Sequence, residues 1–98
     1  MEYRLRLHPR IGWKISRWGL SEFLLMEAYI HLHDLPQDPM TYLHRDQDGP
    51  GNLFVFDARD PDSPDFNHIF MFRVFFDEDE RHLNVVNASY WRNFDPMR

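Results

Sequence analysis

The chain has 98 residues, enough for a single domain over 1–98, and its 43% hydrophobic content is too high for a disordered protein. It contains no cysteine, which excludes disulfides and thiolate zinc sites, and no apolar run approaches the ~20 residues that span a bilayer. The net charge of −5 repels a polyanion, so we expect neither generic nucleic-acid binding nor DNA-specific binding.

The charges are distributed unevenly along the chain. Residues 1–18 carry five Lys or Arg against one acid, whereas residues 34–80 carry twelve acids against three arginines, a net charge of −9. Only the basic N-terminal segment would attract nucleic acid. Because the N-terminus lacks the apolar segment of a signal peptide, we expect a soluble cytoplasmic protein with no membrane association.

The first half of the chain predicts one strand and two helices. Residues 2–8 alternate between polar and apolar side chains, which is the pattern of a half-buried strand, and Pro9 ends it. Apolar residues at helical spacing predict a short helix over 11–18 and a core helix over 23–35, with Ser21 as the N-cap of the second.

The second half predicts mainly strands and loops. In order, the segments are a helical turn within 37–43, a loop over 46–52, a strand over 53–57, a loop over 58–65, a long strand over 68–76, an acidic turn over 77–80 and a strand over 83–88. This order predicts an α+β fold: an N-terminal strand, a helical hairpin, and then antiparallel strands that form one small sheet with helices on one face.

The long strand carries one charge, Arg73, inside an apolar run. Strand alternation assigns Phe66, His68, Phe70, Phe72, Val74 and Phe76 to one face, and Ile69, Met71, Arg73 and Phe75 to the other. We expect the first face to pack on the helices and the second to stay open. A guanidinium among apolar side chains must either form an ion pair within the protein or contact a bound molecule. The open face is therefore predicted to bind a partner or a ligand.

Three segments resemble those of the RelE/ParE superfamily of small toxin-like proteins. They are EYRLRLHP at residues 2–9, FRVFFDEDE at 72–80 and LNVVNASYWR at 83–92. They resemble the family's opening strand and its closing strand–turn–strand, in the same order, over most of the chain. The resemblance implies the family's fold and one of two activities. RelE-like members bind the ribosome and cleave messenger RNA, ParE-like members act on gyrase, and both are neutralised by an antitoxin that wraps the surface.

By this resemblance, Arg73 corresponds to the strand arginine that contacts phosphate in the RNA-cleaving members, and residues 89–92 to a tail that holds further catalytic groups. Metal-independent cleavage needs a base for the 2′-hydroxyl, a cation for the phosphate and an acid for the leaving oxygen. The candidate catalytic set is therefore Arg73 on the phosphate, Tyr90 or His82 for proton transfer, and Arg92 as a second clamp.

Each candidate also has a purely structural interpretation. The alternatives are a salt bridge to a carboxylate for Arg73, a tail packed on the sheet for Tyr90 and Arg92, and an exposed strand position for His82. The chain also has a single lysine, Lys14, whereas the family's ribonucleases are rich in lysine and basic overall. These features leave catalysis and simple binding as open alternatives.

No metal or cofactor is predicted. His31 and His33 stand two residues apart on a predicted helix, so their side chains point about 200° apart and cannot hold one metal together. The sequence has no phosphate-binding glycine loop, dinucleotide-binding motif or nucleophile elbow.

Two hypotheses follow. In the first, the chain is a toxin-like protein of the RelE/ParE type. Its open face, centred on Arg73, engages the ribosome, messenger RNA or another macromolecule and is masked by an antitoxin-like protein. If the protein is catalytic, it is a metal-independent endoribonuclease. In the second, it is a non-catalytic protein-interaction module or homodimer on the same fold, with Arg73, Met71 and Phe75 at the interface.

Overall fold

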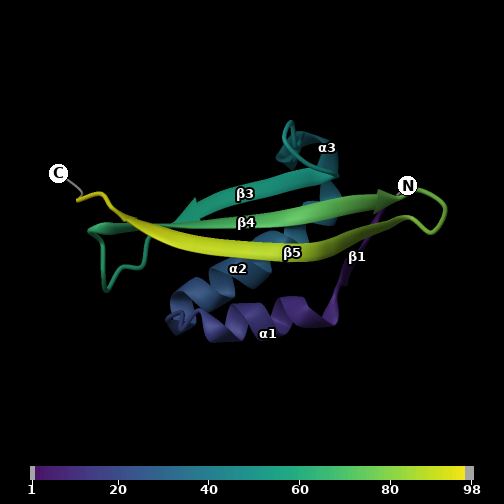
Figure 1. Ribbon diagram of the computed structural model, residues 1–98. Helices are drawn as coiled ribbons and strands as arrows, with labels where there is room; N and C mark the ends of the chain where they lie inside the picture. The colour runs from purple at the N-terminus through teal and green to yellow at the C-terminus, as the bar shows by residue number, and fades with distance from the viewer. Residues whose placement is uncertain (1, 97–98) are drawn as a thin grey trace.

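The computed structural model describes residues 2–96. Its elements, in chain order, are β1 (Arg4–Leu7), α1 (Pro9–Arg17), α2 (Glu22–Asp34), the 3₁₀-helix η1 (Leu35–Gln37), α3 (Pro39–Tyr42), β2 (Leu43–Arg45), β3 (Asn52–Ala58), β4 (Phe66–Asp77) and β5 (His82–Phe94). Helices α1 and α2 lie on the same face of a single sheet (Figure 1). The predicted α+β fold, with its N-terminal strand and with helices on one face, is confirmed.

The sheet has five strands in the order β1-β5-β4-β3-β2. The β2–β3, β3–β4 and β4–β5 pairs are antiparallel, but β1 runs parallel to β5, so the sheet is mixed rather than purely antiparallel. A parallel pair needs a long connection, and here all the elements from α1 to β4 separate the two strands. Strand β2 is absent from the sequence prediction because its three residues are too few to show an alternation.

Strand β5 is longer than the sequence predicts. The prediction ends the strand at Ala88 and treats 89–92 as a tail, but β5 pairs with β4 as far as the Phe66–Phe94 pair. Arg73 lies opposite Asn87 whereas its neighbour Val74 lies opposite Val85, so β5 holds one extra residue, Val86, in a β-bulge. The tail interpretation of Tyr90 and Arg92 is therefore wrong, and both belong to a paired strand.

The core lies between the sheet and the two helices, and the predicted division of β4 into a buried and an open face is confirmed. Phe70, Phe72 and Val74 are completely buried, whereas Arg73 and Phe75 on the other face are only partly so. The helices contribute Ile11, Ile15, Leu24, Ala28 and Leu32 to this core. Burial of this apolar surface is the main force that holds the helices on the sheet.

Local capping sets where the helices start. Pro9 ends β1 as predicted and also occupies the first position of α1, where a missing N–H costs nothing. The His8 side chain caps this helix by accepting from the Arg10 N–H at 3.2 Å. Ser21 is the N-cap of α2 as predicted, and its hydroxyl accepts from the Leu24 N–H at 3.3 Å.

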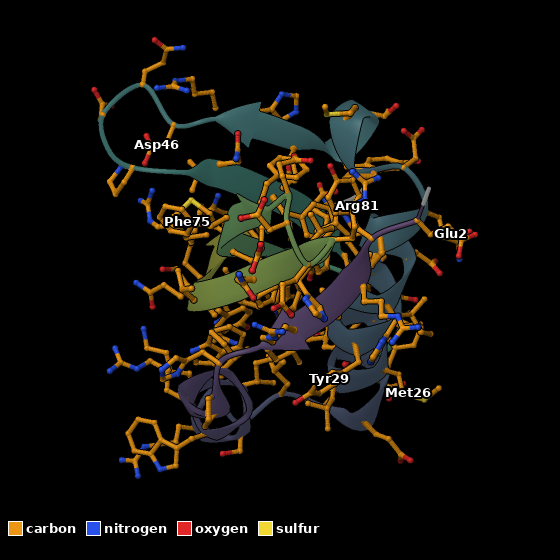
Figure 2. The ribbon with its side chains drawn as sticks, turned by 90° about the vertical axis from the view of Figure 1, so that its right-hand side faces the viewer. Glu2, Met26, Tyr29, Asp46, Phe75 and Arg81 are labelled. Carbon is orange, nitrogen blue, oxygen red and sulfur yellow. The ribbon has the colours of Figure 1, made fainter. Side chains whose placement is uncertain are left out.

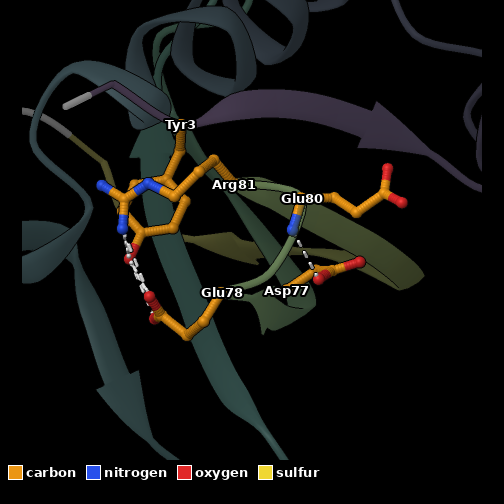
Figure 3. A network of polar contacts seen from close by, with 5 residues as sticks. All are labelled: Tyr3, Asp77, Glu78, Glu80 and Arg81. Atoms are coloured by element: carbon orange, nitrogen blue, oxygen red, sulfur yellow. Dashed lines mark hydrogen bonds and ion pairs between the residues drawn. The ribbon is translucent and has the colours of Figure 1, made fainter.

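The acidic turn between β4 and β5 is connected to β1 by side chains (Figure 3). The Tyr3 hydroxyl donates to the Glu78 carboxylate at 2.9 Å, and the Arg81 guanidinium lies 4.0 Å from the centre of the Tyr3 ring. Arg81 also lies 3.3 Å from Glu78, and the Glu80 N–H donates to Asp77 at 3.1 Å. The turn predicted over 77–80 is confirmed, and its carboxylates help to hold the N-terminal strand.

Two glycines have the left-handed backbone but differ in their surroundings, which gives a matched test of the loop over 46–51. Gly19 has φ +65° and open space around it, whereas a Cβ at Gly51, with φ +77°, would lie 3.0 Å from the Phe75 ring and 3.1 Å from the Val74 carbonyl. Gly19→Ala is expected to lower the free energy of unfolding by about 1 kcal/mol, the cost of that backbone conformation. Gly51→Ala should lower the free energy of unfolding by clearly more. Urea titration of both variants measures the two losses. Equal losses would contradict the close packing of this loop on Phe75.

Candidate functional site

The structure divides the four predicted catalytic residues between the two faces of the sheet. In the register of β4 and β5, His82 lies opposite Asp77 and belongs with Arg73 to the open face. Tyr90 and Arg92 belong to the helix-covered face. Arg73 and His82 are also separated along the sheet, because four positions of a strand span about 13 Å. Tyr90 and Arg92 are therefore the only two of the four that the structure brings together.

Arg73 is bound within the protein. Its guanidinium donates to the Asp46 carboxylate at 2.7 Å and to the Pro50 carbonyl, both in the loop that precedes β3. Figure 2 shows Asp46 on this loop beside Phe75. The Asp48 N–H and the Arg73 guanidinium lower the pKa of Asp46, so its carboxylate is charged at neutral pH. The salt-bridge interpretation of Arg73 thus describes what the structure shows.

His82 lies at the β1 edge of the sheet and has its own partners. The Arg6 guanidinium is 3.0 Å from its Nδ1 atom, and the Glu80 carboxylate is 4.0 Å away. These contacts hold the ends of β1 and β5 together, far from Tyr90 and Arg92.

The remaining open face carries a continuous apolar surface. We call it the open-face patch, and it consists of Leu53, Val55, Ile69, Met71 and Trp91. Val55 pairs with Met71, and Ile69 pairs with Trp91, so these side chains are cross-strand neighbours on β3, β4 and β5. Val55 is 47% exposed and Trp91 41%. This part of the sheet presents apolar side chains to solvent.

On the other face, Tyr90 and Arg92 line a pocket of about 540 Å³ at the start of α2. We call it the His68 pocket, and its polar lining includes Ser21, Asp60, His68, Tyr90 and Arg92. The His68 Nδ1 atom is 2.7 Å from the Tyr90 hydroxyl. The Trp18 ring stacks on Tyr90 with 5.4 Å between ring centres.

The His68 side chain is buried, and only one of its two ring nitrogens has a hydrogen-bond partner among the described residues. Its side chain is 4% exposed, and its Nε2 atom is buried without a hydrogen-bond partner among the described residues. Burial lowers the pKa of His68; the positive charge of Arg92 lowers it further, and the negative charge of Asp60 opposes the shift. The imidazole is therefore neutral at pH 7 and carries one N–H and one lone pair on its two ring nitrogens.

The other groups of the pocket have fixed charge states. The Ser21 hydroxyl and the Asp62 N–H lower the pKa of Asp60, so this 5% exposed residue is a buried carboxylate. Burial raises the pKa of Tyr90, although Arg92 opposes the shift, so the phenol is protonated at neutral pH. The Arg92 guanidinium lies 4.6 Å from the centre of the Phe66 ring and forms no ion pair within residues 2–96.

Sequence reasoning missed two members of this pocket. It assigned His68 only to the core face, and it placed Asp60 in the loop predicted over 58–65 without a role. A histidine at a core position of a strand was the one available signal, because a buried polar side chain needs a partner. Neither His31 nor His33 belongs to the pocket, and His31 stacks on Phe56 with 4.2 Å between ring centres.

In comparisons with protein-family models, curated proteins and solved structures, no match to this chain was found. Over the part of the chain that the structure describes, no helix has the length and apolar character needed to cross a bilayer. Within the same residues, no group of three or more His, Asp or Glu side chains is arranged to hold a metal ion.

Proposed function

We propose that this protein is a toxin-like protein of the RelE/ParE type that acts by binding a protein partner through the open-face patch. The observation that carries the proposal is the contrast on the open face: Arg73 is bound by Asp46 and the Pro50 carbonyl, whereas Val55 and Trp91 are exposed to solvent. A cationic side chain already paired within its own fold is poorly placed to hold an RNA phosphate, whereas exposed contiguous apolar side chains are typical of interaction surfaces.

The fold order supports the family part of the proposal without defining the activity. A strand, two helices and then antiparallel strands follow one another as the resemblance implies, but one fold can host several functions. Cleavage of RNA by Arg73, Tyr90, Arg92 and His82 would require side chains from both faces of the sheet to meet at one phosphate. Binding requires only the open face.

The charge around the open-face patch indicates the chemistry of the partner. Asp57 lies on the same face as the patch, opposite Ile69, and its side chain is exposed. An apolar segment flanked by basic side chains would complement this surface. We therefore propose a partner, antitoxin-like or target, whose contacting segment combines these two features, and a second copy of this chain is the alternative occupant.

The test compares two aspartate variants with nearly equal starting exposure. Val55 on the open face is 47% exposed and Ile30 on α2 is 48% exposed, so Ile30→Asp is the control for Val55→Asp. On induced expression we expect the wild type and Ile30→Asp to arrest growth with intact transcripts. Val55→Asp should relieve the arrest, because a buried unpaired carboxylate opposes docking.

Arg73→Gln distinguishes binding from RNA cleavage in the same experiment. This variant should still arrest growth, provided that circular dichroism shows it folded. Cleaved transcripts that become intact in Arg73→Gln would overturn the binding proposal in favour of a ribonuclease. Normal growth with abundant folded wild-type protein would overturn the toxin part, and equal arrest by Val55→Asp would exclude the open-face patch as the interface.

A further inference from the structure

Strand β5 has a long edge that no other strand of the described chain covers. On this side β1 pairs with β5 only from His82 to Val85, whereas β5 continues to Phe94 (Figure 1). We propose that two copies of this protein pair their β5 strands along this edge, antiparallel and about a two-fold axis at Trp91, so that their sheets become one. The contact lies at the edge of the sheet and does not depend on the binding function assigned to the open face.

The backbone groups of this edge point away from the sheet. The Ala88 carbonyl accepts from the Lys14 Nζ atom of α1 at 3.2 Å, so it is directed away from β4. Alternate residues of a strand direct their N–H and C=O groups to the same side, and the pairing of β5 with β4 is regular beyond the bulge. Tyr90, Arg92 and Phe94 therefore present their backbone groups to the free edge, where a further strand can pair with them.

Only the first part of this edge is protected against such pairing. Proteins protect the edges of sheets with bulges, lysines and prolines, and here the bulge at Val86 and the Lys14 side chain serve that purpose near Ala88. Residues 89–94, with the sequence SYWRNF, contain no proline and one charge. Trp91 is 41% exposed and Phe94 69%. An exposed aromatic segment of low charge without proline is typical of strands that pair with another chain.

The exposed segment complements a second copy of itself. With the axis at Trp91, the two Trp91 side chains are cross-strand neighbours on the open face, and aromatic pairs there are favourable. Ser89 then lies opposite Asn93, and the two polar side chains can form a hydrogen bond. On the other face Tyr90 lies opposite Arg92, which suits a guanidinium beside an aromatic ring. Tyr90 and Arg92 are also the pair whose outward backbone groups bond to each other.

Neighbouring registers are less favourable. With the axis at Arg92, the two guanidinium groups would lie directly opposite each other, and like charges in that position are destabilising. With the axis at Tyr90, Phe94 would lie opposite Val86, where the bulge disrupts the ladder. The axis at Trp91 avoids both conflicts, and it makes the contact self-complementary, as a two-fold interface requires.

The dimer would join the two open-face patches. Trp91 belongs to the patch and pairs with Ile69 of β4, so the patch of one copy continues into that of the other across the two Trp91 side chains. A partner with two copies of its contacting segment would then bind with increased avidity. This consequence rests on the proposed function, whereas the edge contact itself does not.

Disulfide trapping tests the register directly, because the chain has no cysteine of its own. Ser89→Cys and Asn93→Cys are prepared as separate variants, and each is oxidised in air alone and in an equal mixture. In the mixture the two cysteines lie opposite each other with Cα atoms about 4.5 Å apart, within reach of a disulfide, so we expect a covalent dimer. In either variant alone the two thiols are four positions apart along the strands, about 13 Å, so no covalent dimer should form.

Sedimentation of the full chain measures the dimer without a cross-link. We expect the wild type to sediment as a dimer and Trp91→Lys as a monomer, because two ammonium groups would face each other across the axis. Ile30→Lys is the matched control, because Ile30 on α2 is 48% exposed and lies outside the sheet, and this variant should stay dimeric. Val55→Asp on the open face should also stay dimeric.

Three results would overturn the edge contact: no covalent dimer in the mixture, as much covalent dimer in either variant alone, or a folded wild type that sediments as a monomer. A dimer that is lost in Val55→Asp and kept in Trp91→Lys would place the contact on the open face and would also overturn it. The cysteine variants keep Trp91, so the test does not require that Trp91→Lys folds. Because growth arrest is not measured, a failure here is distinguishable from a failure of the proposed function.

Discussion

Phe70→Ala is expected to lower the free energy of unfolding by about 3–5 kcal/mol, the usual cost of removing a buried aromatic ring. The Phe70 side chain is completely buried between the sheet and the helices and packs against Trp18, Phe56 and Tyr90. Its loss would leave a cavity in the centre of the core. Urea denaturation followed by circular dichroism measures the change.

The matched control is Phe75→Ala, the same substitution on the opposite face of the same strand. Phe75 is only partly buried and packs under the loop that contains Gly51. Because less apolar area is removed from the folded protein, we expect roughly half the loss seen for Phe70→Ala. A loss as large for Phe75→Ala would contradict the assignment of the two faces.

The second large effect is a loss of stability between pH 7 and pH 5 that depends on His68. Burial lowers the pKa of His68 in the folded protein, whereas the unfolded chain titrates near the ordinary value of about 6.5. The unfolded state therefore binds the proton first. The stabilising contribution of neutral His68 is complete above pH 6.5 and is lost as the pH falls toward the lowered pKa. The slope is at most about 1.4 kcal/mol per pH unit.

The pH window separates this effect from that of the carboxylates. The pKa values of Asp46 and Asp60 are lowered from 3.8, so their contributions are present above that value and are lost only at lower pH. We expect His68→Gln to remove the slope between pH 6.5 and pH 5, and His44→Gln, at an exposed position, to retain it. Urea titrations at pH 8, 7, 6 and 5 provide the comparison, and an unchanged slope in folded His68→Gln would contradict the assignment.

The slope reports the surroundings of His68 in the folded protein. Burial lowers the pKa of His68, the positive charge of Arg92 lowers it further, and the negative charge of Asp60 opposes the shift.

Much of the fold was predictable because it depends on local patterns. The alternation over 68–76 separates the buried face from the open face, since neighbouring side chains on a strand point in opposite directions. Ser21 starts α2 because its hydroxyl satisfies a free N–H of the first turn. Each of these features involves residues within a few positions of one another, so the sequence contains the whole of the physical cause.

The partners of single side chains were less predictable because they come from distant parts of the chain. The sequence indicates that Arg73 needs a partner, but the choice of Asp46 depends on how the loop before β3 folds over the sheet. Asp60, in the loop between β3 and β4, lines the pocket of His68 together with Ser21 at the start of α2. Contacts of this kind require the packing of helix on sheet.

By itself, the sequence determined the class of fold, the helix starts and the two faces of β4, and the tertiary structure decided which candidate site residues share a face. The deciding feature is the bulge at Val86. Without it, the register set by the turn would place Tyr90 opposite Ile69, on the open face with Arg73. The extra residue shifts the pairing by one position, and because side chains alternate along a strand, Tyr90 and Arg92 point instead to the face of His68.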